Sequence, residues 1–242
     1  MFVWRFGTPI GYKNDIMLHT SHWDLPSLID HTILRPEATR SDVLRLCQEA
    51  KAQGFGVIFV PPCHAAEAVE AVHGAPIRVG IPVGFPLGGH TTAVKVAEAL
   101  DGVSHGATVL DMVLNVSRLK SGDVDAVRQD IAEVVKATPQ VEHKVILETC
   151  YLTDQEKFTA CRLAVEAGAD YVKTSTGFGA GGATVADIEL MKKAVGGTIK
   201  VKASGGIRDW ATAKAMLEAG ADRIGTSASL AIVAQWRAAH HH

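Results

Sequence analysis

The sequence predicts a single (β/α)8 barrel, the TIM-barrel class of α/β proteins. Short runs rich in β-branched residues alternate with longer amphipathic runs, and eight of the short runs can be counted in the 242 residues. An internal echo supports a repeated αβ unit, because EAGADYVKTSTG (166–177) and EAGADRIGTSAS (218–229) share a helix end, a glycine stop, a strand and a Thr-Ser exit. A doubly wound open sheet is the alternative.

The expected elements follow in chain order. The strands are SLIDHT (27–32), GVIFV (56–60), IRVGIPV (77–83), TVLDMVL (108–114), KVILET (144–149), DYVKTS (170–175), IKVKAS (199–204) and DRIGTS (222–227). The helix TDQEKFTACRLAVEAG begins at Thr153, has Glu156 at capping-box spacing and stops at Gly168. The helix DVDAVRQDIAEVV places five aliphatic residues on one face, namely Val124, Val127, Ile131, Val134 and Val135.

We expect one catalytic domain over residues 25–239, because no linker-like stretch divides the chain. Residues 1–24 are predicted to form either a short leading helix or an arm. The final three histidines (240–242) resemble the remnant of a purification tag and are left out of functional reasoning.

Composition excludes several classes of protein. The chain is 47% hydrophobic and 21% charged with a formal net charge of −2, so no basic field is present to attract nucleic acid or an anionic membrane. No run is long and apolar enough to span a bilayer, and the N-terminus lacks a positive-then-apolar signal pattern. The four cysteines show no CxxC spacing, which favours reduced thiols in a cytoplasmic protein.

Charged residues fall on the inner face of several strands. Strand residues of a barrel alternate between the interior and the helix layer. Alternation places Asp111 and Lys173 inside, together with Lys200 and Lys202. A lone strand lysine more often reaches solvent or pairs with a carboxylate, and a lone aspartate is more often structural. Two inward amines beside one carboxylate favour a functional site, because buried charge is costly unless it is compensated.

Two neighbouring lysines suit chemistry that needs a neutral amine. A free lysine has a pKa of ~10.4, so on the order of 0.04% is neutral at pH 7. A second ammonium and partial desolvation both lower that pKa, and the neutral amine can form a Schiff base with a carbonyl. We expect Lys173 as the nucleophile, Lys202 as the perturbing cation and Asp111 as a proton carrier, although alternation alone does not decide which lysine attacks.

Glycine loops follow the last two strands. SGGIRD (204–209) supplies Gly205 and Gly206, whose backbone N–H groups can approach an anion, and GTSAS (225–229) supplies the Ser227 hydroxyl. The alternative is a pair of ordinary βα turns with a serine cap. A third loop, TSTGFGAGG (174–182), is too long for a simple turn and is expected to close over a ligand.

Taken together, these segments resemble the deoxyribose-phosphate aldolase family, Schiff-base aldolases on a (β/α)8 barrel. The matching segments run in order from residue 28 to about 229 and are LIDHTILRP, VGFPLG, VLDMVLN, KVILETCYL, DYVKTSTGFGAGGAT, VKASGGIR and RIGTSAS. VKTSTGF with KASGGIR is the most specific pair. Some members carry a tyrosine on a C-terminal tail, whereas the last tyrosine here is Tyr171.

The resemblance implies a class I aldolase, a lyase that reversibly cleaves 2-deoxy-D-ribose 5-phosphate to D-glyceraldehyde 3-phosphate and acetaldehyde. It makes Lys173 the Schiff-base lysine, Lys202 the lysine that lowers its pKa and Asp111 the proton-relay acid. The residues that it implies for substrate binding are Gly177, Gly205, Gly206 and Ser227 at the phosphate, and Asp30 and Thr32 near the other end of the substrate. No metal or organic cofactor is implied, and a homodimer is expected.

Two rival functions are weighed. Another barrel aldolase would act on a different sugar phosphate, and a zinc-dependent one is disfavoured because no histidines cluster at ligand spacing on strand ends. A non-catalytic barrel that binds sugar phosphates would need the anion loops but not the lysine pair. The expected partners are therefore a phosphorylated sugar and aldehydes.

Overall fold

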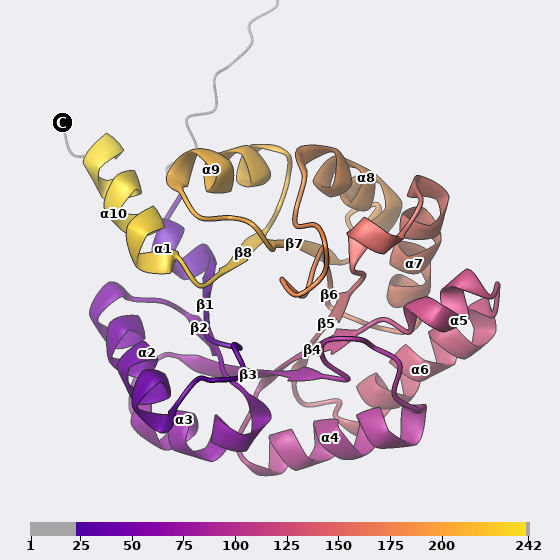
Figure 1. Ribbon diagram of the computed structural model, residues 1–242, viewed down its shortest axis with the longest axis horizontal. Helices are drawn as coiled ribbons and strands as arrows, with labels where there is room; N and C mark the ends of the chain where they lie inside the picture. The colour runs from indigo at the N-terminus through magenta and orange to yellow at the C-terminus, as the bar shows by residue number, and fades with distance from the viewer. Residues whose placement is uncertain (1–22, 241–242) are drawn as a thin grey trace, which may run out of the picture.

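A computed structural model describes residues 23–240, which form a closed barrel of parallel strands surrounded by helices (Figure 1). Each strand pairs with the next in the chain, and β8 closes the barrel against β1. The strands are β1 (Ile29–Thr32), β2 (Val57–Phe59), β3 (Arg78–Val83), β4 (Val109–Val113), β5 (Glu142–Ile146), β6 (Tyr171–Lys173), β7 (Lys200–Ser204) and β8 (Arg223–Thr226). The predicted (β/α)8 barrel is confirmed, and the open sheet is excluded.

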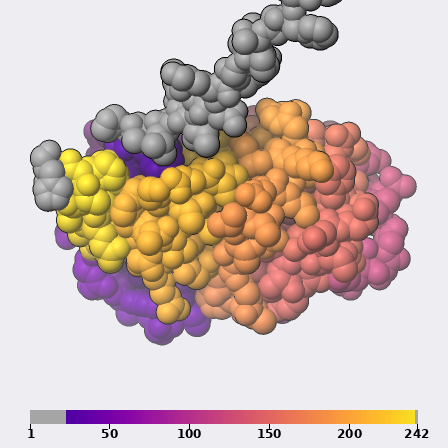
Figure 2. Space-filling model, turned by 90° about the horizontal axis from the view of Figure 1, so that it is seen from above, coloured from indigo at the N-terminus to yellow at the C-terminus, as the bar shows by residue number. Residues whose placement is uncertain are grey.

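Helices form the outer layer, and consecutive βα units are neighbours around the side of the molecule (Figure 2). Within the described residues the helical segments are α1 (Leu25–Leu28), α2 (Arg40–Gln53), η1 (Pro62–His64), α3 (Ala65–Ala71), α4 (Thr92–Ser104), α5 (Val116–Lys120), α6 (Val124–Ala137), η2 (Thr149–Tyr151), α7 (Asp154–Glu166), α8 (Val185–Val195), α9 (Trp210–Glu218) and α10 (Ser229–His240). None of the helices between residues 23 and 240 is long and apolar enough to cross a membrane.

Most strands are shorter than the sequence predicts. Ser27 and Leu28 belong to α1 rather than to the first strand. The fifth strand begins at Glu142 and ends at Ile146, and two residues later Glu148 takes a left-handed conformation with φ 55°. Extended backbone cannot continue through such a residue, so Thr149 begins the short helix η2 instead.

The predicted helix signals are largely present. Thr153 caps α7, since its side chain accepts from the Glu156 N–H while the Glu156 carboxylate accepts from the Thr153 N–H at 2.7 Å. Gly168, two residues beyond the last residue of α7, has φ 83°. On α6 the buried face starts at Val127, whereas Val124, the first helical residue, is 38% exposed.

The hydrophobic core has two parts. The larger part lies between the strands and the helices, and a small cluster of Val57, Phe59 and Val109 fills the barrel interior. A Cβ on Gly80 of β3 would lie 2.6 Å from the ring of Phe59, so glycine is required where β3 passes that ring. The ring lies 4.0 Å from the Nζ of Lys202 and therefore forms an apolar floor under the charged groups of the barrel.

The two ends of the predicted domain are only partly described. Residues 1–22 and 241–242 lie outside the described residues, so the expected N-terminal arm or helix stays a prediction. His240 is the last residue of α10, and its ring centroid lies 5.5 Å from that of Trp236. The domain limits and the tag likewise stay predictions.

Candidate active site

Lys173 and Lys202 both donate to one oxygen of Asp111. The Nζ of Lys173 lies 2.8 Å from Oδ2 of Asp111, and the Nζ of Lys202 lies 2.7 Å from the same atom. The pairing of β6 with β7 places Lys173 directly beside Lys202, and all three side chains are buried. The structure thus brings together the three residues for which the sequence predicts catalytic roles.

Local packing explains how the long side chain of Lys202 fits inside the barrel. A Cβ on Gly225, on the adjacent strand β8, would lie 2.8 Å from Cε of Lys202. Because glycine has no Cβ, this position leaves free the space that the aliphatic part of the Lys202 side chain occupies. Asp111 sits in the middle of β4 between Leu110 and Met112, whose side chains turn into the core between strands and helices.

The pKa of Lys173 is lowered to about 8. Burial is the largest cause and the Lys202 ammonium adds to it, while the Asp111 carboxylate opposes both. About a tenth of Lys173 is then neutral amine at pH 7, which is more than a hundredfold above a free lysine, as an order of magnitude. From the sequence we expected a second ammonium and partial desolvation to lower the pKa of Lys173, and in the structure burial is the larger of these two causes.

Lys202 has the opposite electrostatics. Burial lowers its pKa, but the carboxylates of Asp111 and Asp30 outweigh burial and raise the pKa above its ordinary value. Burial likewise raises the pKa of Asp111, yet Lys173 and Lys202 together hold it below its usual range. Lys202 therefore remains an ammonium and Asp111 remains a carboxylate over the pH range in which Lys173 loses its proton.

Asp30 lies inside the barrel rather than at the cavity. Its Oδ2 is 2.6 Å from the Nζ of Lys202, and its Oδ1 accepts from Nε of Arg223 at 2.6 Å. Burial raises the pKa of Asp30, but these two cations outweigh it and hold the pKa well below its usual range. Asp30 thus contacts Lys202, and its predicted place near the substrate stays a prediction, while Thr32 lines the cavity.

A third buried lysine, Lys144 on β5, was not predicted. Its Nζ donates to Glu142 and lies 3.8 Å from Oδ1 of Asp111 and 5.0 Å from the ring centroid of Tyr171. Strand alternation in KVILET already turns this residue inward, so the signal was present in the sequence. Lys200, which was predicted to point inward, is the exposed first residue of β7.

Each carboxylate of the barrel cluster already contacts cations other than Lys173. Asp30 contacts Lys202 and Arg223, Asp111 contacts Lys202 and Lys144, and Glu142 contacts Lys144 and Arg78. A protonated Lys173 would add a buried cation with no further anion among the described residues of the cluster. Because unpaired buried charge is costly, this arrangement favours the neutral amine.

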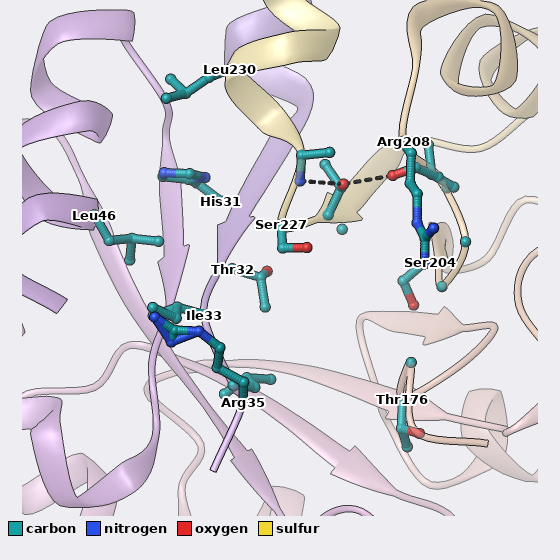
Figure 3. Close-up of a pocket in the computed structure, with 18 of the residues that line it drawn as sticks. His31, Thr32, Ile33, Arg35, Leu46, Thr176, Ser204, Arg208, Ser227 and Leu230 are labelled. Atoms are coloured by element: carbon teal, nitrogen blue, oxygen red, sulfur yellow. Dashed lines mark hydrogen bonds between the residues drawn. The ribbon is translucent and has the colours of Figure 1, made fainter. Parts of the chain in front are cut away.

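A cavity of about 690 Å³ opens at the carboxyl ends of the strands, the end at which barrel enzymes bind substrates. Lys173 reaches its base, and its walls include five of the residues predicted to bind substrate: Thr32, Gly177, Gly205, Gly206 and Ser227. Figure 3 shows Thr32, Ser227 and Thr176 around one central space, with the guanidinium of Arg208 directed toward it. Arg208 was not predicted, although it belongs to the SGGIRD motif.

The two glycine loops are fixed to one another. Oγ1 of Thr226 donates to the carbonyl of Ile207 at 2.7 Å and accepts from the Ala228 N–H at 2.9 Å (Figure 3). Gly205 and Gly206 have φ values of 87° and 77°, a region that strongly favours glycine. The backbone geometry that would let N–H groups approach an anion is therefore built into the loop after β7.

The loop after β6 is held by a buried glutamate. Glu148 accepts from the backbone N–H of Thr176 at 3.2 Å and from its hydroxyl, and that hydroxyl accepts from the Phe178 N–H at 3.0 Å. The half-exposed ring of Phe178 forms an edge-to-face contact with Phe85 at 5.3 Å. Residues 176–178 thereby border the cavity, and closure of this loop over a ligand stays a prediction.

Among residues 23–240 no group of three His, Cys, Asp or Glu side chains is arranged to hold a metal ion. All four cysteines are free thiols.

A lysine amine of lowered pKa, a permanent ammonium and a carboxylate at the mouth of a (β/α)8 barrel define an enzyme of the class I aldolase type. The family model described as DeoC/LacD family aldolase matches residues 26–235. The chain belongs to this family of aldolases.

Curated relatives agree over most of the chain. Deoxyribose-phosphate aldolase of Caldanaerobacter subterraneus subsp. tengcongensis is 52% identical over 217 residues, covering 88% of this chain and 94% of the relative. Deoxyribose-phosphate aldolase of Brevibacillus brevis is 55% identical over 205 residues, covering 85% and 93%. In both comparisons the matched segment covers nearly the whole length of the relative.

Solved structures show the same architecture. One described as "QR15, an Aldolase" superposes with a TM-score of 0.86 at 41% identity, covering 90% of this chain and 98% of the other. A putative deoxyribose-phosphate aldolase from Coccidioides immitis also gives 0.86 at 41% identity, covering 88% and 87%.

Proposed function

We propose that this chain reversibly cleaves 2-deoxy-D-ribose 5-phosphate to D-glyceraldehyde 3-phosphate and acetaldehyde through a Schiff base on Lys173. The observation that carries the proposal is a buried amine with a pKa of about 8, 2.8 Å from Asp111, at the base of a cavity whose rim contains Gly205 and Gly206. The names of the curated relatives support the same substrate.

The neutral amine of Lys173 attacks C1 of the open-chain sugar, and loss of water from the carbinolamine gives a protonated imine. A base then takes the proton of the C3 hydroxyl. The C2–C3 bond breaks, its electron pair moves to the iminium nitrogen, and glyceraldehyde 3-phosphate leaves. Protonation of the remaining enamine at C2 and hydrolysis release acetaldehyde and regenerate the amine.

Asp111 is suited to the two proton transfers. Its Oδ2 accepts from both lysines, while its buried Oδ1 accepts no hydrogen bond from the described residues. We assign to Asp111, acting through a water, the transfer of the proton from the C3 hydroxyl and later back to C2 of the enamine. Lys202 remains charged throughout and stabilises the carboxylate.

The phosphate is expected at the loops after β7 and β8. Gly205, Gly206 and Ser227 line the cavity there, and Arg208 adds a cation at the same wall. Thr32 borders the cavity on the β1 side. We also propose, from the sequence, a homodimer and a cytoplasmic location, and light scattering of the purified protein tests the oligomeric state.

Borohydride trapping tests the function directly. The protein is incubated with deoxyribose 5-phosphate or acetaldehyde, reduced, digested and analysed by mass spectrometry, with Lys173→Leu as the matched control. A stable adduct on the Lys173 peptide, absent from the variant, is the expected result. A folded wild-type protein that binds phosphate but yields no adduct would leave a non-catalytic binding barrel.

A further inference from the structure

His31 lines the cavity from the helix side of β1 rather than from the barrel interior. Alternation along β1 turns Asp30 inward and His31 outward, where its ring packs on Phe55 with centroids 4.9 Å apart. The side chain is only 3% exposed, yet both of its ring nitrogens are bonded. Nδ1 lies 2.9 Å from Oγ of Ser229, and Nε2 lies 2.9 Å from Oε2 of Glu49. Figure 3 shows His31 between Leu46 and Leu230.

Chemistry fixes the direction of these two bonds. The carboxylate of Glu49 accepts the hydrogen bond from His31, so Nε2 of His31 carries a proton. Burial lowers the pKa of His31, and Glu49 opposes it only partly, so the ring is neutral near pH 7 and Nδ1 is an acceptor. The hydroxyl of Ser229 must then donate to Nδ1. The result is one directed chain from Ser229 through His31 to Glu49, which joins α10, β1 and α2.

Ser229 is the point at which this chain meets the predicted phosphate site. It is the first residue of α10, is fully buried and directly follows the turn that carries Ser227. The other side of the turn is fixed by Thr226, which bonds the carbonyl of Ile207 and the N–H of Ala228. The turn is therefore held at both ends, and the hydroxyl of Ser229 bonds His31 and lies 3.2 Å from the Thr226 carbonyl.

We propose that Ser229, His31 and Glu49 form a positioning relay that holds the turn 226–229 in the geometry that binds the phosphate group of the substrate. The proposal rests on the proposed function, since that function supplies the phosphorylated ligand. The relay governs affinity for phosphate and leaves the carbon–carbon chemistry at Lys173 unchanged. His31 is thus a positioning residue rather than a catalytic one.

The test separates phosphate affinity from chemistry. His31→Phe keeps an aromatic ring against Phe55 but removes both bonds, and Ser229→Ala removes a single hydroxyl. For each variant, calorimetry measures binding of inorganic phosphate, and kinetics give kcat and KM for deoxyribose 5-phosphate and for unphosphorylated deoxyribose. Loss of one bond to a buried partner is expected to weaken phosphate binding and to raise the KM for the phosphorylated sugar by about fivefold to tenfold. The kcat/KM for deoxyribose stays within about twofold of wild type.

Conservative and remote variants act as controls. Glu49→Gln retains an oxygen that accepts from Nε2 and is expected to keep wild-type phosphate affinity. Glu49→Ala removes that acceptor and is expected to weaken phosphate binding. His105→Phe and Ser121→Ala change exposed residues of the same types, one at the end of α4 and one just after α5, and are expected to alter no constant.

Two results would overturn the relay. One is an equal loss of activity toward both sugars, which would mean that His31 only supports the fold. The other is unchanged phosphate binding in folded Ser229→Ala. Failure of the proposed function is a separate outcome, namely a wild-type protein that forms no borohydride adduct. Calorimetry with phosphate would still test the relay in that case, because phosphate binding requires no turnover.

Discussion

The ammonium of Lys202 lies 2.6 Å from Oδ2 of Asp30, and both groups are completely buried. This ion pair holds Lys202 in its charged form beside Asp111, because the carboxylate of Asp30 helps to raise the pKa of the lysine. Two lysines on neighbouring strands thereby acquire different protonation states. Lys202 is a fixed cation, and Lys173 is left as the amine that can react.

Replacing Asp30 with asparagine should destabilise the fold. The substitution leaves Arg223 and Lys202 without their shared anion in the barrel interior, and breaking a buried pair in this way costs about 3 kcal/mol. Urea unfolding measures the loss. Asp125→Asn is the matched control, since the side chain of Asp125 is 90% exposed and should change the free energy of unfolding by less than about 0.5 kcal/mol. Equal stabilities for the two variants would contradict a buried ion pair.

Removing Lys173 should abolish turnover without harming stability. Lys173→Leu eliminates the amine but leaves each buried carboxylate of the cluster in contact with another cation. The folded-state pKa of about 8 lies below the ordinary 10.5, so protonation of Lys173 opposes folding at pH 7, and this penalty disappears as pH rises from about 8 to 10.5. The variant should therefore be at least as stable as wild type at pH 7, with an advantage that shrinks above pH 8. Urea unfolding at pH 7 and above pH 8 checks this, and a variant clearly less stable at pH 7 would argue against a lowered pKa for Lys173.

The pH dependence of catalysis should report the same group. Because only the neutral amine attacks, kcat/KM for cleavage should rise about tenfold per pH unit below pH 8 and level off above it. Lys202→Leu removes a cation that lowers the pKa of Lys173, and Oδ2 of Asp111 then accepts a hydrogen bond from Lys173 alone. The rise should then move to higher pH by roughly one unit or more, with a lower rate at pH 7. An unshifted profile in this variant would show that Lys202 does not tune the nucleophile.

Glu148 offers a test of backbone strain at the cavity edge. Its φ of 55° and ψ of 62° are left-handed, and its carboxylate accepts from the buried Thr176 N–H. Both Glu148→Ala and Glu148→Gly lose that bond, at a cost of about 2 kcal/mol. Glycine adopts the left-handed region without a Cβ penalty, so Glu148→Gly should be more stable than Glu148→Ala by about 1 kcal/mol. Thermal or urea unfolding compares the pair, and the reverse order would rule out this conformation in solution.

Much of the barrel and of its reactive centre could be predicted because both depend on local rules. Alternation along single strands turned Asp111 and Lys173 inward, and the closed barrel confirms that orientation. The same rule applied to KVILET would have found Lys144. Lys200 was also predicted to point inward, but it is the first residue of β7 and is exposed. Burial of a strand residue therefore depends on its position along the strand as well as on the face to which its side chain turns.

The strand–helix alternation, the inward lysines and the glycine loops follow from the amino-acid sequence, because periodicity, capping and left-handed backbone preferences act over a few neighbouring residues. The folded barrel is needed to see that Asp30 pairs with Lys202, that burial outweighs the second ammonium in lowering the pKa of Lys173, and that His31 links α2 to α10. Those properties depend on distances between strands far apart in the chain and on how completely water is excluded from the barrel. Neither quantity exists until the eight strands have closed.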